Sequence, residues 1–197
     1  MMKIERFQEE DMNVVKPLAK QAWHTFYDGF SEDYLLCIAE CIVRHNFTDA
    51  DLSLKISDEE GVKGLIFGTR KGKIVDLSDW VKKQSENLSP IEKDLLETLC
   101  EYMDEADRNT LARMSDEDVK LSLFVSTRKG CGRELLNAIT EEFRKHRFRK
   151  MFLWTDTSCD HDYYPTHGFT LATTYRDRHY STEEKDYMTY IYWKPIL

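Results

Sequence analysis

The spacing of hydrophobic positions changes several times along the chain, and each spacing predicts a different kind of element. Over residues 14–27 the apolar side chains recur every three or four positions, which is the spacing of an amphipathic helix. The same spacing returns over 34–43, and Ser31 stands before two acidic residues, as expected of a helix cap. The N-terminal part is therefore predicted to hold a short strand at 3–7 followed by two helices.

Alternation of apolar and polar residues then replaces the helical spacing. It covers 52–56, and after an acidic turn residues 62–68 have the composition of a returning strand, which predicts an antiparallel hairpin. Residues 74–115 have helical spacing again and are strongly acidic. Within them the run Ser-Pro-Ile-Glu at 89–92 has the residue types of a capping box with proline in the first turn. We predict a helical insertion over 74–115.

Strand patterns dominate the second half of the chain. Residues 119–125 have an apolar residue at every second position, which predicts a strand. The helical pattern that follows has an apolar face and carries basic residues near its end, as the helix dipole favours. A short apolar run at 151–154 predicts the next strand, and two more are expected near 169–175 and 187–193. This mixture predicts one α/β domain over residues 1–197.

Composition narrows the class of protein. The 197 residues are 41% hydrophobic and 32% charged, with a formal net charge of -8, and no apolar run approaches the roughly 18 residues of a membrane span. The first residues lack the apolar stretch of a secretory signal. Five cysteines without paired Cys-x-x-Cys motifs suggest neither a disulfide framework nor structural zinc, so a cytoplasmic location is expected. The acidic balance argues against nucleic-acid binding.

A glycine-containing turn between strand 119–125 and the next helix is the first candidate site. Gly130 and Gly132 let a ligand approach the backbone where a helix start leaves N–H groups unpaired, which suits an anion. The alternative is a simple strand-to-helix turn. No Gly-x-x-x-x-Gly-Lys loop is present, and Leu135 replaces the third glycine of the dinucleotide fingerprint. The basic residues around the turn are Arg128, Lys129 and Arg133.

Two motifs resemble the GNAT superfamily of N-acetyltransferases. Residues 127–132, Thr-Arg-Lys-Gly-Cys-Gly, are similar to its acetyl-CoA loop, Arg/Gln-x-x-Gly-x-Gly/Ala, although Thr127 departs from the first position. Residues 164–169, Tyr-Pro-Thr-His-Gly-Phe, are similar to the family's Tyr-x-x-x-Gly-Phe, at the right distance downstream. Together they favour the ligand-binding interpretation of the turn.

The resemblance covers residues 119–175 closely and 3–70 more loosely, and it does not extend over 74–115. It implies an α/β (α+β) fold, in which a twisted, mixed and mostly antiparallel sheet is flanked by helices. The sheet would be splayed at the end of strand 119–125 to admit the cofactor. The helical insertion is then expected to wall the acceptor site.

The resemblance also implies acetyl-CoA as cosubstrate. The end of strand 119–125 would hold the pantetheine arm as an added strand does, and the amides of 129–134 would hold the pyrophosphate. The loop after the next strand would contribute Thr157, Ser158 or Asp160 in place of the family's asparagine. The cofactor-binding residues implied in this way are Leu123, Phe124, Val125, Arg128, Lys129, Gly130, Cys131, Gly132, Arg133, Glu134, Ser158 and Tyr164.

Tyr164 is the residue implied to do chemistry. In the family the tyrosine of this motif protonates the departing thiolate, and a phenol suits that role. The alternatives are a buried structural aromatic at 164 and a one-residue slip that makes Tyr163 the acid. The general base implied near the start of strand 119–125 is Glu117 or Asp118, each of which is alternatively a solvated charge at a strand end.

The expected reaction is direct transfer of an acetyl group from acetyl-CoA to a primary amine. The loop between the first two helices borders the acceptor site in the family, so Tyr27 and Asp28 are implied to contact the substrate. The acceptor is a small molecule or a peptide, and a polyamine, an amino acid, an antibiotic and a protein terminus all stay open. Acidic residues in 74–115 favour a cationic one. Monomer and homodimer are both compatible with the sequence.

Two other interpretations remain. One is a CoA-binding module that lacks a competent base, and the other is a protein-interaction domain that works through the acidic insertion. A metal site is not expected, because the metal-ligand types at 159–162 are adjacent on one loop and have no second cluster to complement them.

Overall fold

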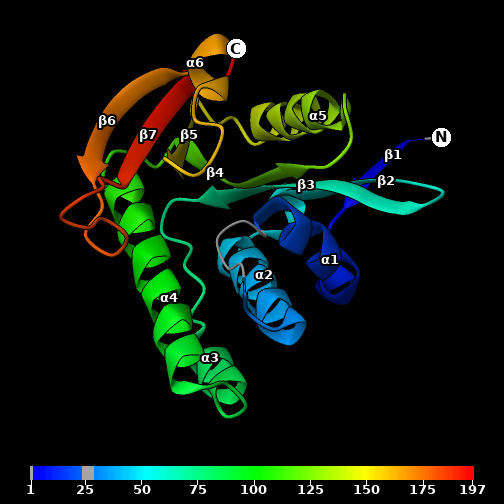
Figure 1. Ribbon diagram of the computed structural model, residues 1–197. Coiled ribbons are helices and arrows are strands. Elements are labelled where there is room, and N and C mark those ends of the chain that lie inside the picture. Colours follow the sequence, from blue (N-terminus) through cyan, green and yellow to red (C-terminus); the bar gives the residue numbers. More distant parts are fainter. Residues whose placement is uncertain (1, 24–28) are drawn as a thin grey trace.

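The computed structural model describes residues 2–23 and 29–197, and its centre is one twisted sheet (Figure 1). In the described residues the sheet has seven strands in the order β1-β2-β3-β4-β5-β7-β6, antiparallel throughout except for the parallel pair β4 and β5. This confirms the predicted fold class. The strands are β1 (Lys3–Arg6), β2 (Ser53–Asp58), β3 (Gly61–Arg70), β4 (Asp118–Ser126), β5 (Lys150–Asp156), β6 (Thr170–Arg176) and β7 (Met188–Pro195).

Helices cover both faces of the sheet. In Figure 1, α5 lies on one face and α1 and α2 lie on the other, beside the long helix α4, which packs against β5 and α2. Between β3 and β4 the chain forms α3 and α4, and both helices lie within the range 74–115 that has helical spacing. The helices are α1 (Met12–Trp23), α2 (Glu32–Asn46), α3 (Ser78–Ser85), α4 (Pro90–Leu111), α5 (Cys131–Lys145) and α6 (Tyr163–Thr166), with 3-10 turns η1 (Glu9–Asp11) and η3 (Ala50–Leu52).

Helix starts follow the local sequence signals. The Ser31 hydroxyl accepts a hydrogen bond from the Tyr34 amide at 3.2 Å, which caps α2. Ser89 and Glu92 form the predicted reciprocal capping box at the start of α4. Each cap satisfies amides that a helix start otherwise leaves unpaired, and together they fix where the two helices begin.

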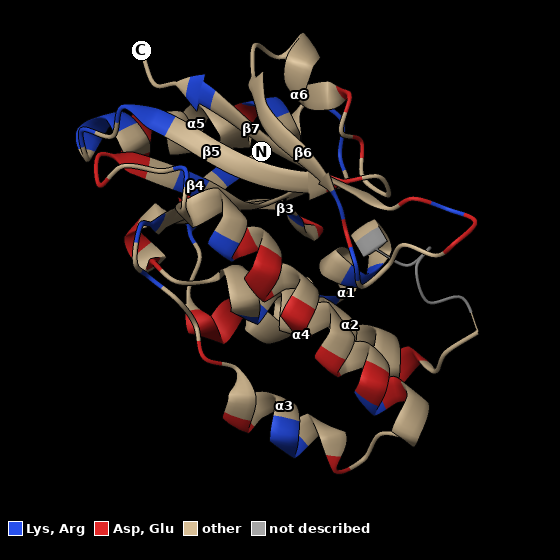
Figure 2. Cartoon of the chain, turned by 90° about the vertical axis from the view of Figure 1, so that its left-hand side faces the viewer, with Lys and Arg blue, Asp and Glu red and all other residues tan. Residues whose placement is uncertain are grey.

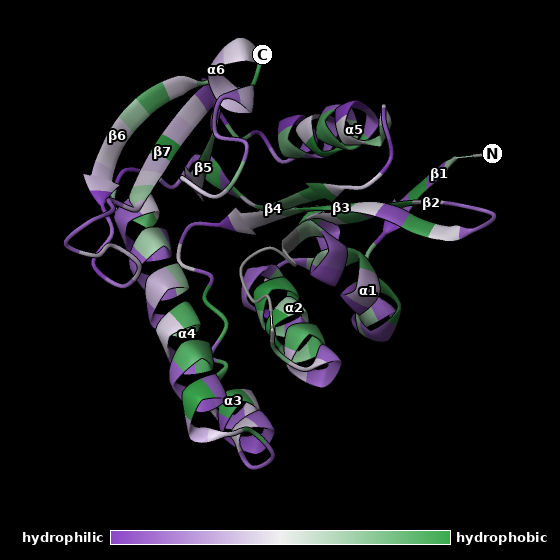
Figure 3. Cartoon of the chain, in the orientation of Figure 1, coloured by the Kyte–Doolittle hydropathy of each residue, from purple (hydrophilic) through white to green (hydrophobic). Residues whose placement is uncertain are grey.

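Hydrophobic residues of the strands and of the surrounding helices (Figure 3) form buried clusters on both sides of the sheet. On one side Leu135, Ile139 and Phe143 of α5 are fully buried against the strands. On the other side Val15 and Val43 belong to a second buried cluster. Full burial of one such side chain stabilises the fold by about 1.5–3 kcal/mol, so α5 is held firmly on the sheet.

The close approach of α5 to the sheet depends on a glycine in β3. A Cβ at Gly68 would lie 2.4 Å from the Phe143 ring, which is too short for any real contact. Glycine therefore permits the ring to rest directly on the strand. Because the N-terminus of this helix is the candidate phosphate site, Gly68 contributes to its placement.

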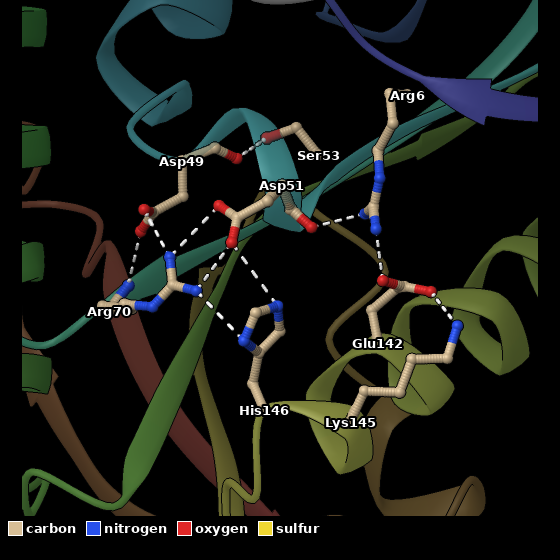
Figure 4. A network of polar contacts seen from close by, with 8 residues as sticks. All are labelled: Arg6, Asp49, Asp51, Ser53, Arg70, Glu142, Lys145 and His146. Atoms are coloured by element: carbon tan, nitrogen blue, oxygen red, sulfur yellow. Dashed lines mark hydrogen bonds and ion pairs between the residues drawn. The ribbon is translucent and has the colours of Figure 1, made fainter.

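A polar network fixes the C-terminal end of α5 (Figure 4). Arg70, at the end of β3, donates to the Asp51 carboxylate at 2.8 Å, and His146 faces the same carboxylate at 3.4 Å. Hydrogen bonding from Arg70 is the main cause that lowers the pKa of Asp51, so the carboxylate is charged at neutral pH. Arg6 of β1 contacts Glu142 of α5. These pairs join the C-terminal end of α5 to β1, η3 and β3.

A bulge in β4 is the feature that shapes the site. Leu123 pairs with Phe67 and Leu121 pairs with Gly68, so Ser122 is an extra residue in β4. Before the bulge Leu121 packs on the α5 side, and after it Leu123 packs on the α1 and α2 side. The apolar residues at every second position of 119–125 predicted this strand but gave no sign of the bulge, because an extra small polar residue leaves the apolar spacing intact.

The strands β4 and β5 separate just before the bulge. Their parallel pairing begins at Asp118 and ends where Lys120 is opposite Phe152. Beyond that pair the edge of β4 that faces β5 has no strand partner among the described residues. The sheet is therefore open between the C-terminal halves of these two strands.

A buried ion pair holds α4 against this opening. The Lys120 ammonium group, 1% exposed, contacts the carboxylate of Asp107 on α4. The same carboxylate accepts a hydrogen bond from the Trp154 indole at 2.6 Å. One carboxylate of α4 thus joins β4 and β5 at the point where they part. Acidic residues also follow the outer side of α4 (Figure 2).

Candidate active site

A cavity of about 720 Å³ occupies the gap between β4 and β5. Its volume is within the range of sites that bind small molecules and cofactors. It reaches both faces of the sheet, since Gly130, Gly132 and Arg133 line one end and Tyr102 and Tyr187 line the other. We call these the α5 end and the α4 end.

The α5 end offers unpaired backbone N–H groups. Gly130 precedes α5 with φ +92°, a conformation that favours glycine. Among the described residues the amides of Lys129, Gly130, Gly132 and Arg133 donate to no acceptor. They lie at the positive end of the helix dipole, and a Cβ at Gly132 would be 3.3 Å from the Phe124 ring. The arrangement suits a phosphate group.

Two amides of the predicted set are already used. The Cys131 amide donates to the Arg128 carbonyl at 3.1 Å, and the Glu134 amide donates to the Gly130 carbonyl at 3.3 Å. The Cys131 thiol is 3% exposed in the core under α5, and burial is the main cause that raises its pKa. The structure therefore gives Cys131 a packing role and leaves the remaining amides as donors.

The basic residues of the loop divide between two places. Arg133 lines the cavity, whereas Arg128 points to the hairpin and pairs with Asp58. Lys129 is exposed at the rim and does not line the cavity. Arg128 thus holds the loop to the hairpin in the described structure, although the sequence placed it among the cofactor contacts.

The open edge of β4 forms one wall. Leu123, Phe124 and Val125, which the resemblance implied as contacts of the pantetheine arm, all line the cavity. Because β5 has left this edge, its backbone groups are available to an extended ligand. The structure therefore brings the predicted pantetheine contacts and the α5 amides to one cavity.

Tyr164 lines the same cavity from α6. Its ring packs edge-on against Phe169 at 5.4 Å between centroids and lies beside Tyr192. Its hydroxyl has no hydrogen-bond partner within the described ranges. Burial, followed by nearby acidic groups, raises the pKa of Tyr164 well above its usual value, so the phenol is protonated at neutral pH. Tyr163 also lines the cavity, but its ring stacks on His167.

The two acidic residues expected near the start of β4 are at its far end from the cavity. Glu117 pairs with Arg149 at 3.0 Å. The Asp118 carboxylate is 4% exposed and accepts from the Ser115 amide at 2.7 Å. Neither residue lines the cavity. Their placement does not fit a general base, because β4 and β5 are still paired at this end.

A carboxylate that the sequence did not single out lies at the α4 end. Asp156, the last residue of β5, is 5% exposed and lines the cavity. It accepts hydrogen bonds from the Tyr102 hydroxyl at 2.8 Å and from the Ser158 amide at 2.9 Å. The Ser158 hydroxyl also contacts Tyr187 at 2.8 Å. Ser158, predicted as a cofactor contact, therefore belongs to this network.

The sequence contained one signal for Asp156 and none for its partner. An acidic residue that ends an apolar strand is unusual enough to mark a site. Tyr102 is 54 positions away in a helix whose docking the periodicity does not specify. Tyr27 and Asp28 lie outside the described residues, so their predicted contact with the acceptor stays a prediction.

A second cavity of about 770 Å³ lies on the other flank of α4, between this helix, α3 and the end of α2. The helical insertion was expected to wall the acceptor site, but three of its acidic residues line this second cavity: Glu97, Glu101 and Asp104.

Within residues 2–23 and 29–197 no group of three or more His, Cys, Asp or Glu side chains is arranged to hold a metal. In the same ranges no helix combines the length and apolarity that crossing a membrane requires.

Comparison with known proteins identifies the fold. No protein-family model matches the chain, and no curated protein matches it by sequence. Solved structures do match over its whole length. The ribosomal-protein-S18-alanine N-acetyltransferase of Escherichia coli is similar with a TM-score of 0.54 and 15% identity, over 100% of this chain and 94% of that one. The chain has the GNAT fold.

Two further structures extend the comparison. Arylalkylamine N-acetyltransferase 2 of Aedes aegypti is similar with a TM-score of 0.56 and 14% identity, covering 100% of this chain and 99% of that one. Ard1 of Thermoplasma volcanium gives a TM-score of 0.54 and 15% identity, covering 100% and 98%. At these identities the likeness concerns the GNAT fold, and the chemistry has to be argued from the cavity itself.

Proposed function

We propose that the protein is an N-acetyltransferase that binds acetyl-CoA in the cavity between β4 and β5 and transfers its acetyl group to a primary amine. One observation carries the proposal: the unpaired amides at the start of α5, the open edge of β4 and the Tyr164 hydroxyl all face one cavity. The GNAT fold, shared with several acetyltransferases, supports it.

The two arms of the cofactor have matching contacts. The pyrophosphate would lie at the amides of Gly130, Gly132 and Arg133, where the helix dipole and Arg133 favour a negative charge. The pantetheine arm would follow the open edge of β4 past Leu123 and Val125, where backbone groups replace those of a neighbouring strand. This path leads the thioester through the gap toward the α4 end.

The proposed reaction is one direct displacement. The amine attacks the thioester carbonyl, a backbone amide of β4 stabilises the oxyanion, and the carbon–sulfur bond breaks. The departing sulfur takes a proton from Tyr164, whose raised pKa keeps that proton available.

Cysteine chemistry is not part of the proposal. The buried Cys131 thiol has a raised pKa and lies in the core under α5. Cys159 lines the cavity, but burial and the charge of Asp156 raise its pKa to about 12. Both thiols are therefore protonated at neutral pH, and a protonated thiol is a poor nucleophile.

Transfer to a panel of amines tests the proposal. Purified protein is incubated with acetyl-CoA and, separately, with a monoamine, a polyamine, an amino acid, an aminoglycoside and a peptide with a free terminus. Thiol release and the mass of the acetylated product are recorded, with reactions lacking amine as the control for hydrolysis. We expect amine-dependent release with at least one class.

The rival interpretations give different results. Tight binding of acetyl-CoA without transfer to any amine would favour a non-catalytic CoA-binding module. Absence of acetyl-CoA binding would remove the site assignment altogether. If a chain shortened by residues 74–115 still folds, a pull-down comparing it with the full chain tests an interaction role for the insertion.

A further inference from the structure

The side chains of β5 divide between the two ends of the cavity. Alternate residues of a strand point to opposite faces of the sheet. Trp154 donates to Asp107 of α4, and Asp156, two residues on, accepts from Tyr102 of α4. Leu153 packs in the core on the α5 side. Asp156 therefore faces α4, on the opposite side of the sheet from the proposed phosphate site.

Asp156 is a buried carboxylate that has no cationic partner in the described part of the chain. It is 5% exposed and accepts from Tyr102 and from the amide and hydroxyl of Ser158. Among the described residues it forms no ion pair with Lys, Arg or His. A buried charge of this kind is costly unless hydrogen bonds and an opposite charge compensate it. The hydrogen bonds are present, and a bound cation would supply the charge.

Aromatic rings surround this carboxylate. The Tyr102 ring lies 5.4 Å from Trp154, 5.0 Å from Tyr180 and 6.1 Å from Tyr187, between centroids. All four side chains line the cavity. Aromatic faces attract ammonium groups, and a desolvated contact is the strongest. The α4 end thus combines a negative charge with walls that suit a cation on an apolar body.

At this end of the cavity, none of the described lining residues carries a positive charge that could pair with a substrate carboxylate. Among the described residues that line the cavity, the basic ones are Arg133 and His167. Arg133 is on α5, and the His167 ring stacks on Tyr163 of α6, so both belong to the α5 end. Leu99 and Met103 of α4 add apolar surface instead. An acceptor with a carboxylate beside its amine would meet Asp156 with like charge.

We propose that Asp156 binds the acceptor's ammonium group and accepts its proton, and that the acceptor is a primary amine with an apolar or aromatic body and no carboxylate. This rests on the proposed acetyltransferase function. Tyr102 and Ser158 are positioning residues, because their hydrogen bonds fix both oxygens of the Asp156 carboxylate.

The protons balance as follows in one cycle. The ammonium gives one proton to Asp156, and the freed lone pair forms the carbon–nitrogen bond. As the carbon–sulfur bond breaks, its electron pair stays on sulfur, which takes the proton of Tyr164. The nitrogen loses a second proton, which restores Tyr164. The products are the amide and free CoA, and Asp156 then releases its proton to water.

Amine binding tests the ammonium site without requiring turnover. 2-Phenylethylamine is titrated by calorimetry into protein saturated with CoA, which carries no acetyl group. Loss of one member of a close charge pair weakens binding by at least about tenfold, so Asp156→Asn should bind the amine that much less tightly than wild type. L-Phenylalanine, which adds only a carboxylate, should also bind at least about tenfold less tightly. Equal binding by the variant, or by phenylalanine, would overturn the proposal.

Turnover tests the proton transfer. Asp156→Asn should lower kcat for 2-phenylethylamine by about a hundred- to ten-thousand-fold and leave acetyl-CoA affinity unchanged. Asp156→Glu should restore part of the rate. Tyr102→Phe keeps the ring and should lower kcat by less, which also serves if Asp156→Asn fails to fold. If folded Asp156→Asn turns over as fast as wild type, Asp156 is not the base. If only Tyr102→Phe folds, turnover by that variant at the wild-type rate contradicts the base role in the same way. If the wild-type protein binds the amine but transfers no acetyl group to it, the proposed function and the proton transfer are refuted. The binding of the ammonium group by Asp156 would still stand.

Discussion

Removal of the Tyr164 hydroxyl is the sharpest probe of the proposed chemistry. Tyr164→Phe keeps the ring and its contacts with Phe169 and Tyr192. Since the hydroxyl has no partner among the described residues, its loss leaves no buried group unpaired. We expect the free energy of unfolding to change by less than about 1 kcal/mol and acetyl-CoA affinity to stay the same.

The expected effect is on the rate. General acid catalysis contributes about 10²- to 10⁴-fold, so the barrier should rise by about 2.7–5.4 kcal/mol. Because burial raises the pKa of Tyr164, its deprotonation should not limit the rate even near pH 10, the usual pKa of a tyrosine. Single-turnover measurements with enzyme in excess over acetyl-CoA isolate the chemical step from product release.

Tyr163→Phe is the matched control. It removes the neighbouring hydroxyl from the same short helix, and the Tyr163 ring keeps its stacking on His167. Its effect on kcat should be the smaller of the two. A near-normal single-turnover rate for Tyr164→Phe would refute the assignment and give Tyr164 a structural role.

The remaining predictions concern stability and the second cavity. Lys120→Met leaves the Asp107 carboxylate without its cation. The free energy of unfolding, measured in urea, should fall by about 3–5 kcal/mol. A fall of less than about 1 kcal/mol would show that the pair is not desolvated. Gly68→Ala forces a methyl group onto the Phe143 ring and should cost about 1–3 kcal/mol in the same assay, whereas an unchanged midpoint would mean that α5 shifts freely. Charge reversal of three acidic residues should leave the acceptor's KM unchanged, because they border the second cavity, and a raised KM would restore them to the acceptor site. These are Glu97, Glu101 and Asp104.

The strand, the turn and the helix start that form the α5 end could be predicted from the sequence, because their signals are local. Gly130 and Gly132 follow a strand and open a helix, so their order along the chain already specifies a turn with unpaired amides. The caps at Ser31 and Ser89 depend on neighbours three residues away. In such places the periodicity and the residue types specify most of the geometry.

The α4 end depends on contacts that are distant in sequence. Asp156 meets Tyr102 only after α4 docks on the sheet through the Lys120 and Asp107 pair. Helical spacing gave α4 an apolar side and an acidic side, but it did not tell which cavity each would face. The bulge at Ser122 could not be predicted from the sequence either. It makes the residues before and after it point to opposite faces of the sheet, but these residues are apolar in both cases.

The expectation for Glu117 and Asp118 came from closeness to β4 in the sequence. The strand is nine residues long and the cavity is at its other end, so closeness to its start did not bring these carboxylates to the site. Asp156, at the end of β5, does line the cavity, because β4 and β5 are parallel and part at the same end.

Acetyl-CoA binding at the start of α5 is the central claim, and thermal unfolding with and without the cofactor tests it most directly. Acetyl-CoA at a hundred times its dissociation constant should stabilise the wild-type protein by about 2.7 kcal/mol and raise its Tm. Gly130→Asp combined with Gly132→Asp puts negative charge where the phosphates would lie. Gly72→Asp is the matched control, because Gly72 also has positive φ and open space around it but follows β3 at the closed end of the sheet. We expect a rise in Tm for the wild type and for the control, and none for the folded double variant. An equal rise in the double variant, or none in the wild type, would contradict the central claim.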